Sequence, residues 1–163
     1  MHPDRFYDLI ESARTGSAPT DPTADAEELR ALLTPIEDED LLGFVRTFES
    51  EHERLNTWAV WGAGYVAAGG MSDDGFRYFR SWLIGKGRDA VETALTDPDD
   101  LADFLDGSTV ENEELEYAAF DLLEERGLDR DLVEQSTDGD PTGEPFDEET
   151  VSTAYPRIAA AVA

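Results

Sequence analysis

The sequence predicts an all-α protein: a single compact domain of roughly seven to eight short helices around a central helical pair rich in Trp and Phe. Apolar residues recur at spacings of three and four along most of the 163 positions, which is the period of one helix face. No stretch shows the alternation and β-branched content of a strand, and no segment repeats. The length suits one domain, residues 1–163, with a sizeable buried core.

Three helices are expected before the aromatic centre of the chain. Apolar residues share one face over residues 3–14, and three leucines line a short helix over residues 29–33. Between these helices, residues 15–24 are rich in Gly, Ser, Pro and Thr, which predicts a mobile loop. The longest helix is expected over residues 38–55, where His52 falls on the apolar stripe.

Residues 56–87 are expected to form the central helical pair. Gly69 follows the first helix and supplies a left-handed C-terminal stop. Ser72 is a good N-cap for the second helix. Asp73 and Asp74 then occupy its first turn, where the helix macrodipole favours carboxylates.

Four further helices are expected, over residues 88–95, 98–105, 111–126 and 147–155. Pro156 is expected to interrupt the last of them, which residues 158–162 then continue. Residues 136–146 are dominated by Ser, Thr, Asp, Gly and Pro, and this composition predicts a second mobile loop.

The chain is strongly acidic, with 39 acidic against 12 basic residues and a formal net charge of −27. Such a charge repels nucleic acid and anionic membranes, so we expect no direct nucleic-acid binding and no membrane association. A partner found by electrostatics should be cationic: a basic protein surface, a polyamine or a metal ion. The interpretation of the acidic residues that we favour is that they simply keep the protein soluble.

Several chemistries lack the residues that they require. The chain has no cysteine, so it forms no disulfide, thiolate metal site or thiol nucleophile. It shows neither a secretory leader nor an apolar stretch long enough to span a membrane, which predicts a cytoplasmic protein. We find no glycine-rich phosphate loop in it, and we assign no cofactor and no metal site.

Residues 56–87 also differ from the rest of the chain in charge. They hold all three tryptophans and carry three bases against two acids, a formal charge of +1, so that the other residues together carry −28. A nearly neutral aromatic segment in so acidic a protein is either the packed core or a surface that meets a partner.

One long motif links the chain to a known family. The motif is G-G-M-S-D-D-G-F-R-Y-F-R-S-W-L-I-G-K-G, followed by A-L-T-D-P-D-D-L-A-D. Further support comes from the opening D-R-F-Y-D-L-I-E-S-A-R, from the tyrosine-containing helix that starts at Glu113, and from the closing P-F-D-E-E-T and A-Y-P-R-I. Over nearly its full length the chain resembles the bacterial domain-of-unknown-function family 4240 (DUF4240), which is common in actinobacteria.

The resemblance implies a helical fold and transfers no established activity. The family usually has Cys where this chain has Met71. A thiol-dependent activity at that position is therefore not essential here, if the family shares one activity.

The sequence Ser72-Asp73-Asp74 is the main candidate for chemistry. Two carboxylates beside a hydroxyl can hold a divalent cation, or they can act as acid and base. The same three residues are also what a helix N-terminus requires. Adjacent helical side chains point about 100° apart, so the two carboxylates do not converge by themselves, and the sequence identifies no third ligand.

Arg77 and Arg80 lie three residues apart on the same predicted helix. Helical spacing brings them within reach of Asp73 and Asp74, and an intrahelical ion pair is the interpretation that we favour. An arginine pair that binds an anion is the alternative, which repulsion by the two aspartates weakens.

Aromatic residues at helical spacing are another candidate for a binding surface. They can line a groove for a peptide or a planar ligand, although such stripes more often form core. Gly62 and Gly64 favour a close helix crossing, because glycine costs about 1 kcal/mol in a helix interior. The aromatic set comprises Trp58, Trp61, Tyr65, Phe76, Phe79 and Trp82.

His52 lies on an apolar stripe and is therefore expected to be a core histidine with satisfied hydrogen bonds. A catalytic triad built on His52 is not expected, because no serine has the sequence context of a nucleophile.

The function that we expect is that of a non-catalytic interaction module whose partner docks at or near residues 69–75. The residues expected to contact a partner are Trp58, Trp61, Tyr65, Ser72, Asp73, Asp74, Arg77, Arg80 and Trp82. A second hypothesis is a metal-dependent or hydrolase-like enzyme that uses Asp73 and Asp74. A third is a nucleic-acid mimic. The sequence leaves the oligomeric state open.

Overall fold

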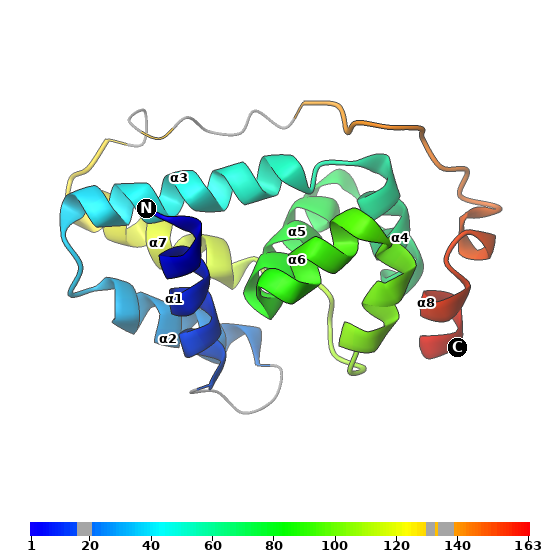
Figure 1. Cartoon of the computed structure of the whole chain (residues 1–163), viewed down its shortest axis with the longest axis horizontal. Coiled ribbons are helices and arrows are strands. Elements are labelled where there is room, and N and C mark those ends of the chain that lie inside the picture. The colour runs from blue at the N-terminus through cyan, green and yellow to red at the C-terminus, as the bar shows by residue number, and fades with distance from the viewer. Residues whose placement is uncertain (16–20, 130–132, 134–138) are drawn as a thin grey trace.

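The computed structural model describes residues 1–15, 21–129, 133 and 139–163, and within these ranges the chain is all-α, with no β-strand. Helices labelled α are α-helices, and those labelled η are 3₁₀-helices (Figure 1). In chain order they are α1 (Pro3–Thr15), α2 (Pro22–Leu33), α3 (Asp38–Arg54), α4 (Trp58–Ala68), α5 (Asp73–Lys86), α6 (Arg88–Thr96), η1 (Pro98–Phe104), α7 (Glu114–Glu125), η3 (Val151–Thr153) and α8 (Pro156–Ala161). The predicted fold class is confirmed.

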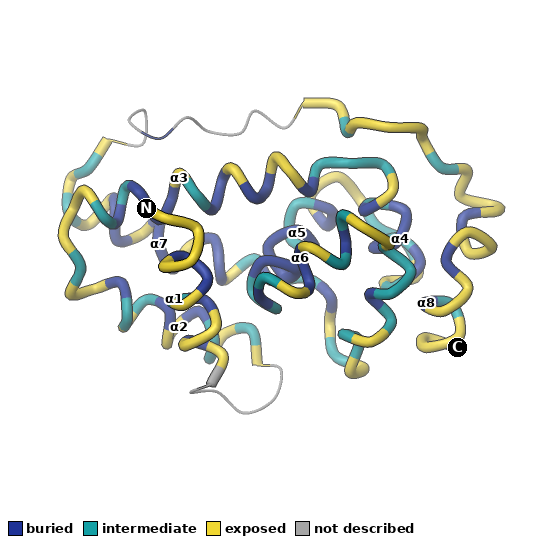
Figure 2. Tube along the Cα trace, in the orientation of Figure 1, coloured by how far each residue is buried: buried dark blue, intermediate teal, exposed yellow. Residues whose placement is uncertain are grey.

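Helix α5 lies at the centre of the bundle, where it contacts α1, α3, α4, α6 and α7 (Figure 1). On one side α2 packs between α1 and α7, and α3 runs along α5 and α7. On the other side α8 packs against α4 and η1. Most of α5 is buried, as the dark blue of the tube in Figure 2 indicates. The buried residues of this helix include Phe76, Phe79 and residues 80–84. The Trp- and Phe-rich pair predicted at the centre is therefore formed by α4 and α5.

The ends of the central pair follow local capping rules. The Thr57 side chain accepts a hydrogen bond from the backbone N–H of Val60 at 3.1 Å, and α4 stops at Gly69 with a left-handed φ of 71°. The Ser72 hydroxyl accepts from the backbone N–H of Gly75 at 3.2 Å. The predicted N-cap of α5 is confirmed, and Asp73 and Asp74 occupy its first turn.

The two glycines inside α4 mark close contacts with other parts of the chain. A Cβ on Gly64 would lie 2.6 Å from Cδ1 of Phe79 on α5. A Cβ on Gly62 would lie 2.8 Å from the Tyr155 hydroxyl in the C-terminal segment. The expected helix crossing is thus found at Gly64, while Gly62 instead admits the ring of Tyr155.

Several predicted boundaries in the N-terminal half and the middle of the chain were wrong. Helix α2 begins at Pro22, inside the loop predicted over residues 15–24, because the Asp21 carboxylate caps it and Pro is preorganised for the first turn. The mobility predicted for that loop falls largely on residues 16–20, which lie outside the described residues. The helix predicted over residues 98–105 is a 3₁₀-helix.

The C-terminal segment differs most from the prediction. Residues 147–155 form turns and the short η3 instead of an α-helix. Pro156 begins α8 where an interruption was expected, because its missing N–H costs nothing in a first turn. Of the loop predicted over residues 136–146, the structure describes residues 139–146, and Thr142 forms an isolated parallel bridge with Thr57.

Candidate functional site

A pocket of about 290 Å³ opens between the start of α4, the outer side of α5 and residues 139–141 of the C-terminal segment. It brings together most of the predicted contact residues. Its walls are formed by Asn56, Trp58, Trp61, Asp73, Asp74, Phe76, Arg77, Arg80, Gly139, Asp140 and Pro141.

The other predicted contact residues have structural partners outside this pocket. Ser72 caps α5, and the Tyr65 hydroxyl donates to Oε2 of Glu148 at 2.8 Å. Trp82 is buried, with 4% of its surface exposed, and it stacks on Phe79. The sequence could not separate these residues from the pocket residues, because both sets follow the same helical period.

Stacked rings form one wall of the pocket. The rings of Trp58 and Trp61 are parallel within 1°, with centroids 5.1 Å apart, and Trp61 and Phe76 are parallel within 4° at 4.8 Å. The Arg80 guanidinium continues the stack, with Cζ 4.7 Å from the Phe76 centroid. The stack begins at Trp58, which is partly exposed, and ends on Phe76 and Arg80, which are buried. Trp61 lies between Trp58 and Phe76, so Trp58 is the outermost ring of the stack.

The two arginines of the pocket are held by groups on neighbouring helices. Arg77 donates from Nε to Oε2 of Glu116 on α7 at 2.9 Å, and from Nη2 to Oε1 of Glu49 on α3 at 3.4 Å. Arg80 is 2% exposed and donates from Nη1 to the backbone carbonyl of His52 at 3.1 Å. The predicted intrahelical ion pair was therefore wrong for Arg77, because buried carboxylates on α3 and α7 compete for it more effectively than exposed ones on its own helix.

The carboxylates at the rim are in the opposite situation. Asp73, Asp74 and Asp140 are exposed. Their side chains form no hydrogen bond or ion pair with any other residue that the structure describes. The pocket thus has engaged cations in its floor and open carboxylates at its mouth.

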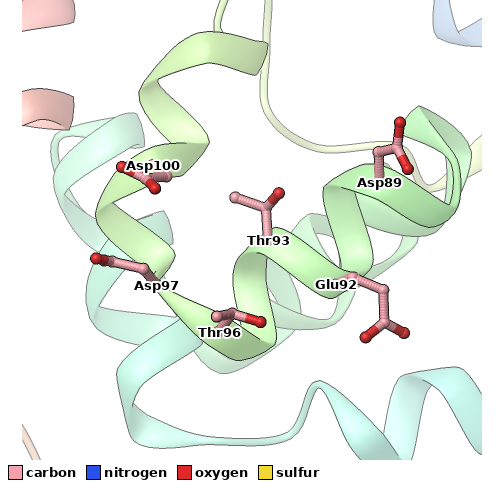
Figure 3. A pocket seen from close by; sticks show the side chains of 6 residues that line it. All are labelled: Asp89, Glu92, Thr93, Thr96, Asp97 and Asp100. Carbon is pink, nitrogen blue, oxygen red and sulfur yellow. The ribbon is translucent and has the colours of Figure 1, made fainter.

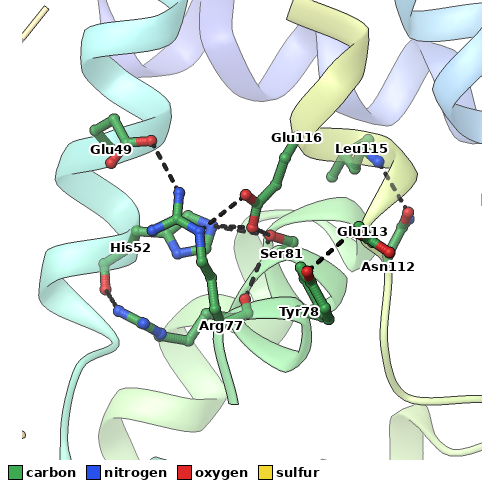
Figure 4. Close-up of polar contacts among 10 residues, drawn as sticks. Glu49, His52, Arg77, Tyr78, Ser81, Asn112, Glu113, Leu115 and Glu116 are labelled. Carbon is green, nitrogen blue, oxygen red and sulfur yellow. Dashed lines mark hydrogen bonds and ion pairs between the residues drawn. The ribbon is translucent and has the colours of Figure 1, made fainter. Parts of the chain in front are cut away.

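A buried polar cluster lies behind the arginines (Figure 4). The Ser81 hydroxyl lies 2.6 Å from Oε1 of Glu116 and 2.9 Å from Nε2 of His52. Because Glu116 is paired with Arg77, its carboxylate only accepts, so Ser81 donates to it. His52 must then donate from Nε2 to the Ser81 oxygen, which assigns the neutral Nε2–H tautomer.

Burial and the nearby guanidinium groups reinforce this protonation state of His52. The ring is completely buried, and burial, followed by the charges of Arg80 and Arg77, lowers the pKa of His52 well below its ordinary value. Within the described part of the chain, Nδ1 has no hydrogen-bond partner. The expected satisfied core histidine is thus satisfied at one nitrogen only.

The cluster has the residue types of a catalytic triad in a different arrangement. The hydroxyl of a nucleophilic serine donates its hydrogen bond to the histidine base, whereas the Ser81 hydroxyl donates to Glu116 and accepts from His52. Ser81 is also completely buried. The cluster therefore ties α3, α5 and α7 together and holds Arg77 in place. Sequence reasoning missed Glu49 and Glu116, although each occupies a position on the apolar stripe of its helix.

A second hollow, of about 490 Å³, lies between α6 and η1 (Figure 3). Its acidic residues mostly have partners: Glu92 pairs with Arg54, Asp100 pairs with Arg157, and the Asp97 side chain caps η1. Of the residues that the structure describes, those that line the hollow are Asp89, Glu92, Thr93, Thr96, Asp97 and Asp100, and none of these is aromatic. Among the described residues, neither this hollow nor the pocket contains three or more His, Cys, Asp or Glu side chains arranged to hold a metal ion.

The fold and the pocket define a small helical protein with an aromatic pocket that is rimmed by acidic residues. The chain belongs to the family described as protein of unknown function (DUF4240), whose pattern residues 1–125 match. No curated protein and no solved structure matches the chain. The closing motifs after residue 125, and with them the wall at residues 139–141, lie outside the matched region. In the described part of the chain, every helix is too short or too polar to cross a membrane.

Proposed function

We propose that this protein is a non-catalytic cytoplasmic interaction module that receives a basic side chain of a partner protein in the pocket beside Trp58. One observation carries the proposal. Among the described residues, the carboxylates of Asp73, Asp74 and Asp140 at the pocket mouth have no hydrogen-bond or ion-pair partner, while Arg77 and Arg80 are held by groups in the floor. A cation entering the pocket meets open negative charge and does not have to displace an existing ion pair.

The aromatic wall supports the same choice of ligand. A lysine or arginine head placed over an indole ring gains about 0.5–2 kcal/mol from the cation–π interaction. The aliphatic stem of such a side chain also packs on apolar surface while its head stays hydrated. The net charge of −27 would raise the association rate with a basic partner.

The two other hypotheses lack a comparable observation. A metal-dependent or hydrolase-like site needs Asp73 and Asp74 to converge with further ligands, and both side chains are exposed in the first turn of α5. A nucleic-acid mimic needs carboxylates spaced like phosphates along one face, and the rim of the pocket is a compact group. Both remain hypotheses for the experiments below to address.

The proposal is tested by titrating a synthetic tetralysine peptide into the protein, followed by tryptophan fluorescence and calorimetry. The same peptide with acetylated side chains keeps the shape and loses the charge, so it should not bind. The double variant Asp73→Asn with Asp74→Asn should weaken binding of tetralysine about tenfold, which corresponds to about 1.4 kcal/mol.

A matched control separates the pocket from overall charge. Asp89→Asn with Asp121→Asn removes the same two charges at exposed positions outside the pocket. This variant should bind tetralysine within about twofold of the parent protein, because screened charges at a distance contribute little. Equal weakening in both double variants would show that net charge alone attracts the peptide and would reject the pocket. Spermidine is the comparison ligand. If spermidine binds as tightly as tetralysine, and if the double variant Asp73→Asn with Asp74→Asn loses the same affinity for it, the partner would be a polyamine and not a peptide.

A further inference from the structure

A segment outside the family match forms one side of the pocket. We call residues 139–148 the C-terminal strap. Its backbone pairs with the connection between α3 and α4: the Thr142 N–H donates to the Asn56 carbonyl at 3.0 Å, and the Trp58 N–H donates to the Thr142 carbonyl at 2.9 Å. The Asn56 side-chain amide also donates to the Gly139 carbonyl at 2.9 Å. The strap is therefore held by its main chain directly beside the first ring of the aromatic wall.

Side chains of the strap add a second set of contacts along α4. The ring of Phe146 lies edge-on to Trp58, with centroids 5.8 Å apart, and at 5.3 Å from Tyr65. Glu148 accepts the hydrogen bond of the Tyr65 hydroxyl. Aromatic pairs of this geometry contribute beyond their buried area, so Phe146 helps to fix both the strap and the exposed ring of the wall.

The chain beyond the strap is anchored independently. The Tyr155 hydroxyl donates to the Ala59 carbonyl at 2.7 Å, over the space left by Gly62. Arg157 pairs with Asp100, and with Asp103 at 2.8 Å. Lifting the strap therefore does not require α8 to leave the bundle.

We infer that the C-terminal strap completes the pocket, so that seating of the strap and binding of a basic side chain stabilise each other. The inference rests on the proposed function. Gly139, Asp140 and Pro141 form a wall of the pocket, and Asp140 supplies one of its three open carboxylates. With the strap lifted, the pocket loses both the wall and that charge. Coupling between two such events is reciprocal, since each must favour the other by the same factor.

Hydrogen exchange of two amides reports the seating of the strap. The N–H groups of Trp58 and Thr142 are bonded across the strap, so they exchange when it lifts. Tetralysine at about ten times its dissociation constant should slow this exchange about tenfold, if the lifted state does not bind the peptide. Phe146→Ala should speed exchange without peptide and weaken peptide binding by the same factor by which the population of the seated strap falls.

A second phenylalanine provides the control. Phe104 is partly buried in η1 and packs on the core away from the pocket lining. Phe104→Ala should leave the affinity for tetralysine unchanged, even if it lowers overall stability. Faster exchange of Trp58 and Thr142 on adding peptide would overturn the inference, because the strap would then be an occupant that the ligand displaces. Unchanged exchange with bound peptide would also overturn it and leave the proposed function intact, whereas absence of peptide binding would reject the proposed function itself.

Discussion

The aromatic pocket beside α5 and the acidic hollow between α6 and η1 are both rich in carboxylates, yet they differ in which charges are already paired. In the hollow, Glu92 and Asp100 are paired with arginines, and Asp97 caps a helix. In the pocket, the arginines are held by neighbouring helices, and the acids at the mouth have no partner in the part of the chain that the structure describes. The density of acidic residues therefore does not identify a site in this protein. The pairing of each charge does, together with an aromatic wall.

The largest expected effect on stability comes from removing one of the two carboxylates that hold Arg77. Glu116→Gln removes the charge that holds Arg77 and accepts from Ser81, in a side chain only 10% exposed. We expect a loss of about 2 kcal/mol in the free energy of unfolding, because breaking a mostly buried charged pair leaves its partners poorly satisfied. Urea melts measure it, with the exposed neighbour Glu114→Gln as the control, expected within about 0.5 kcal/mol of the parent.

The same variant, Glu116→Gln, should also reduce the difference in charge pairing between the pocket and the hollow. Without the Glu116 charge, Arg77 keeps its longer contact to Glu49 at 3.4 Å, and its head can turn towards Asp73 or Asp74, so that an acid of the pocket becomes paired as in the hollow. Binding of tetralysine should weaken in Glu116→Gln and stay unchanged in Glu114→Gln. Full stability and full binding in Glu116→Gln would show that the buried cluster does not hold the arginine in place.

The second prediction concerns the pH dependence of stability. The arginines of the pocket are held by a cluster that contains the buried, neutral His52, and no described residue in the lining of the hollow is a histidine. Burial beside Arg80 and Arg77 places the pKa of His52 in the folded protein below its unfolded value of about 6.5. The stabilising contribution is therefore complete above about pH 6.5 and is lost as pH falls towards the folded pKa. At pH 5.5, one pH unit below the unfolded pKa, this loss is at most about 1.4 kcal/mol.

The measurement is the difference in stability between the parent and His52→Gln, followed by urea melts from pH 8 to pH 5.5. This difference removes the titration of the many carboxylates that both proteins share. A pH-independent difference between the parent and His52→Gln would contradict the neutral, buried assignment.

A third prediction distinguishes a helix cap from a catalytic group at the rim of the pocket. Ser72→Ala should cost about 1 kcal/mol of stability, because alanine cannot accept the hydrogen bond from the Gly75 N–H. Ser72→Asp should be nearly neutral, because an aspartate side chain accepts this bond as serine does. Asp73→Asn should lose only a few tenths to about 1 kcal/mol of its interaction with the helix macrodipole. Thermal and urea melts of the three variants suffice. Higher stability in Asp73→Asn would instead indicate repulsion between Asp73 and Asp74, as in a metal-binding or catalytic pair.

The smallest expected effect tests whether the aromatic wall, which the pocket has and the described lining of the hollow lacks, is required for binding. Arg157→Gln removes the partner of Asp100 and Asp103 and so opens carboxylates near the hollow. We expect no additional site for tetralysine, because no aromatic residue lines this hollow. Calorimetry should still give one peptide per chain. A second equivalent of bound peptide would show that open carboxylates are enough without a stacked wall.

Most of the helices could be predicted from the sequence because their signals are local. The capping of α5 by Ser72 depends on residues within one turn, and the stop at Gly69 depends on a backbone conformation that glycine tolerates. The errors occurred where two local signals compete. At Pro22 and Pro156, proline was interpreted as a breaker, although it also fits the first turn of a helix.

The candidate site was only partly predictable. The sequence indicated Trp58, Asp73 and Arg77 among its contact residues, and the pocket contains all three. It did not indicate Glu49 or Glu116, since a carboxylate on an apolar stripe is recognisable only once its partner is known. It also did not indicate the contribution of residues 139–141, which were predicted to be part of a mobile loop.

The amino-acid sequence by itself determined the helical class, the helix ends at Gly69 and Ser72, the acidic charge and the membership in the family. Each depends on composition, on a motif, or on residues three to four positions apart, where helix geometry alone sets the distance. The tertiary structure decided which charges are paired. Arg77 and Glu116 are 39 residues apart, and Tyr155 reaches Ala59 across 96 residues. Such contacts depend on how whole helices pack, and packing is the outcome of many weak interactions that no short stretch of sequence contains.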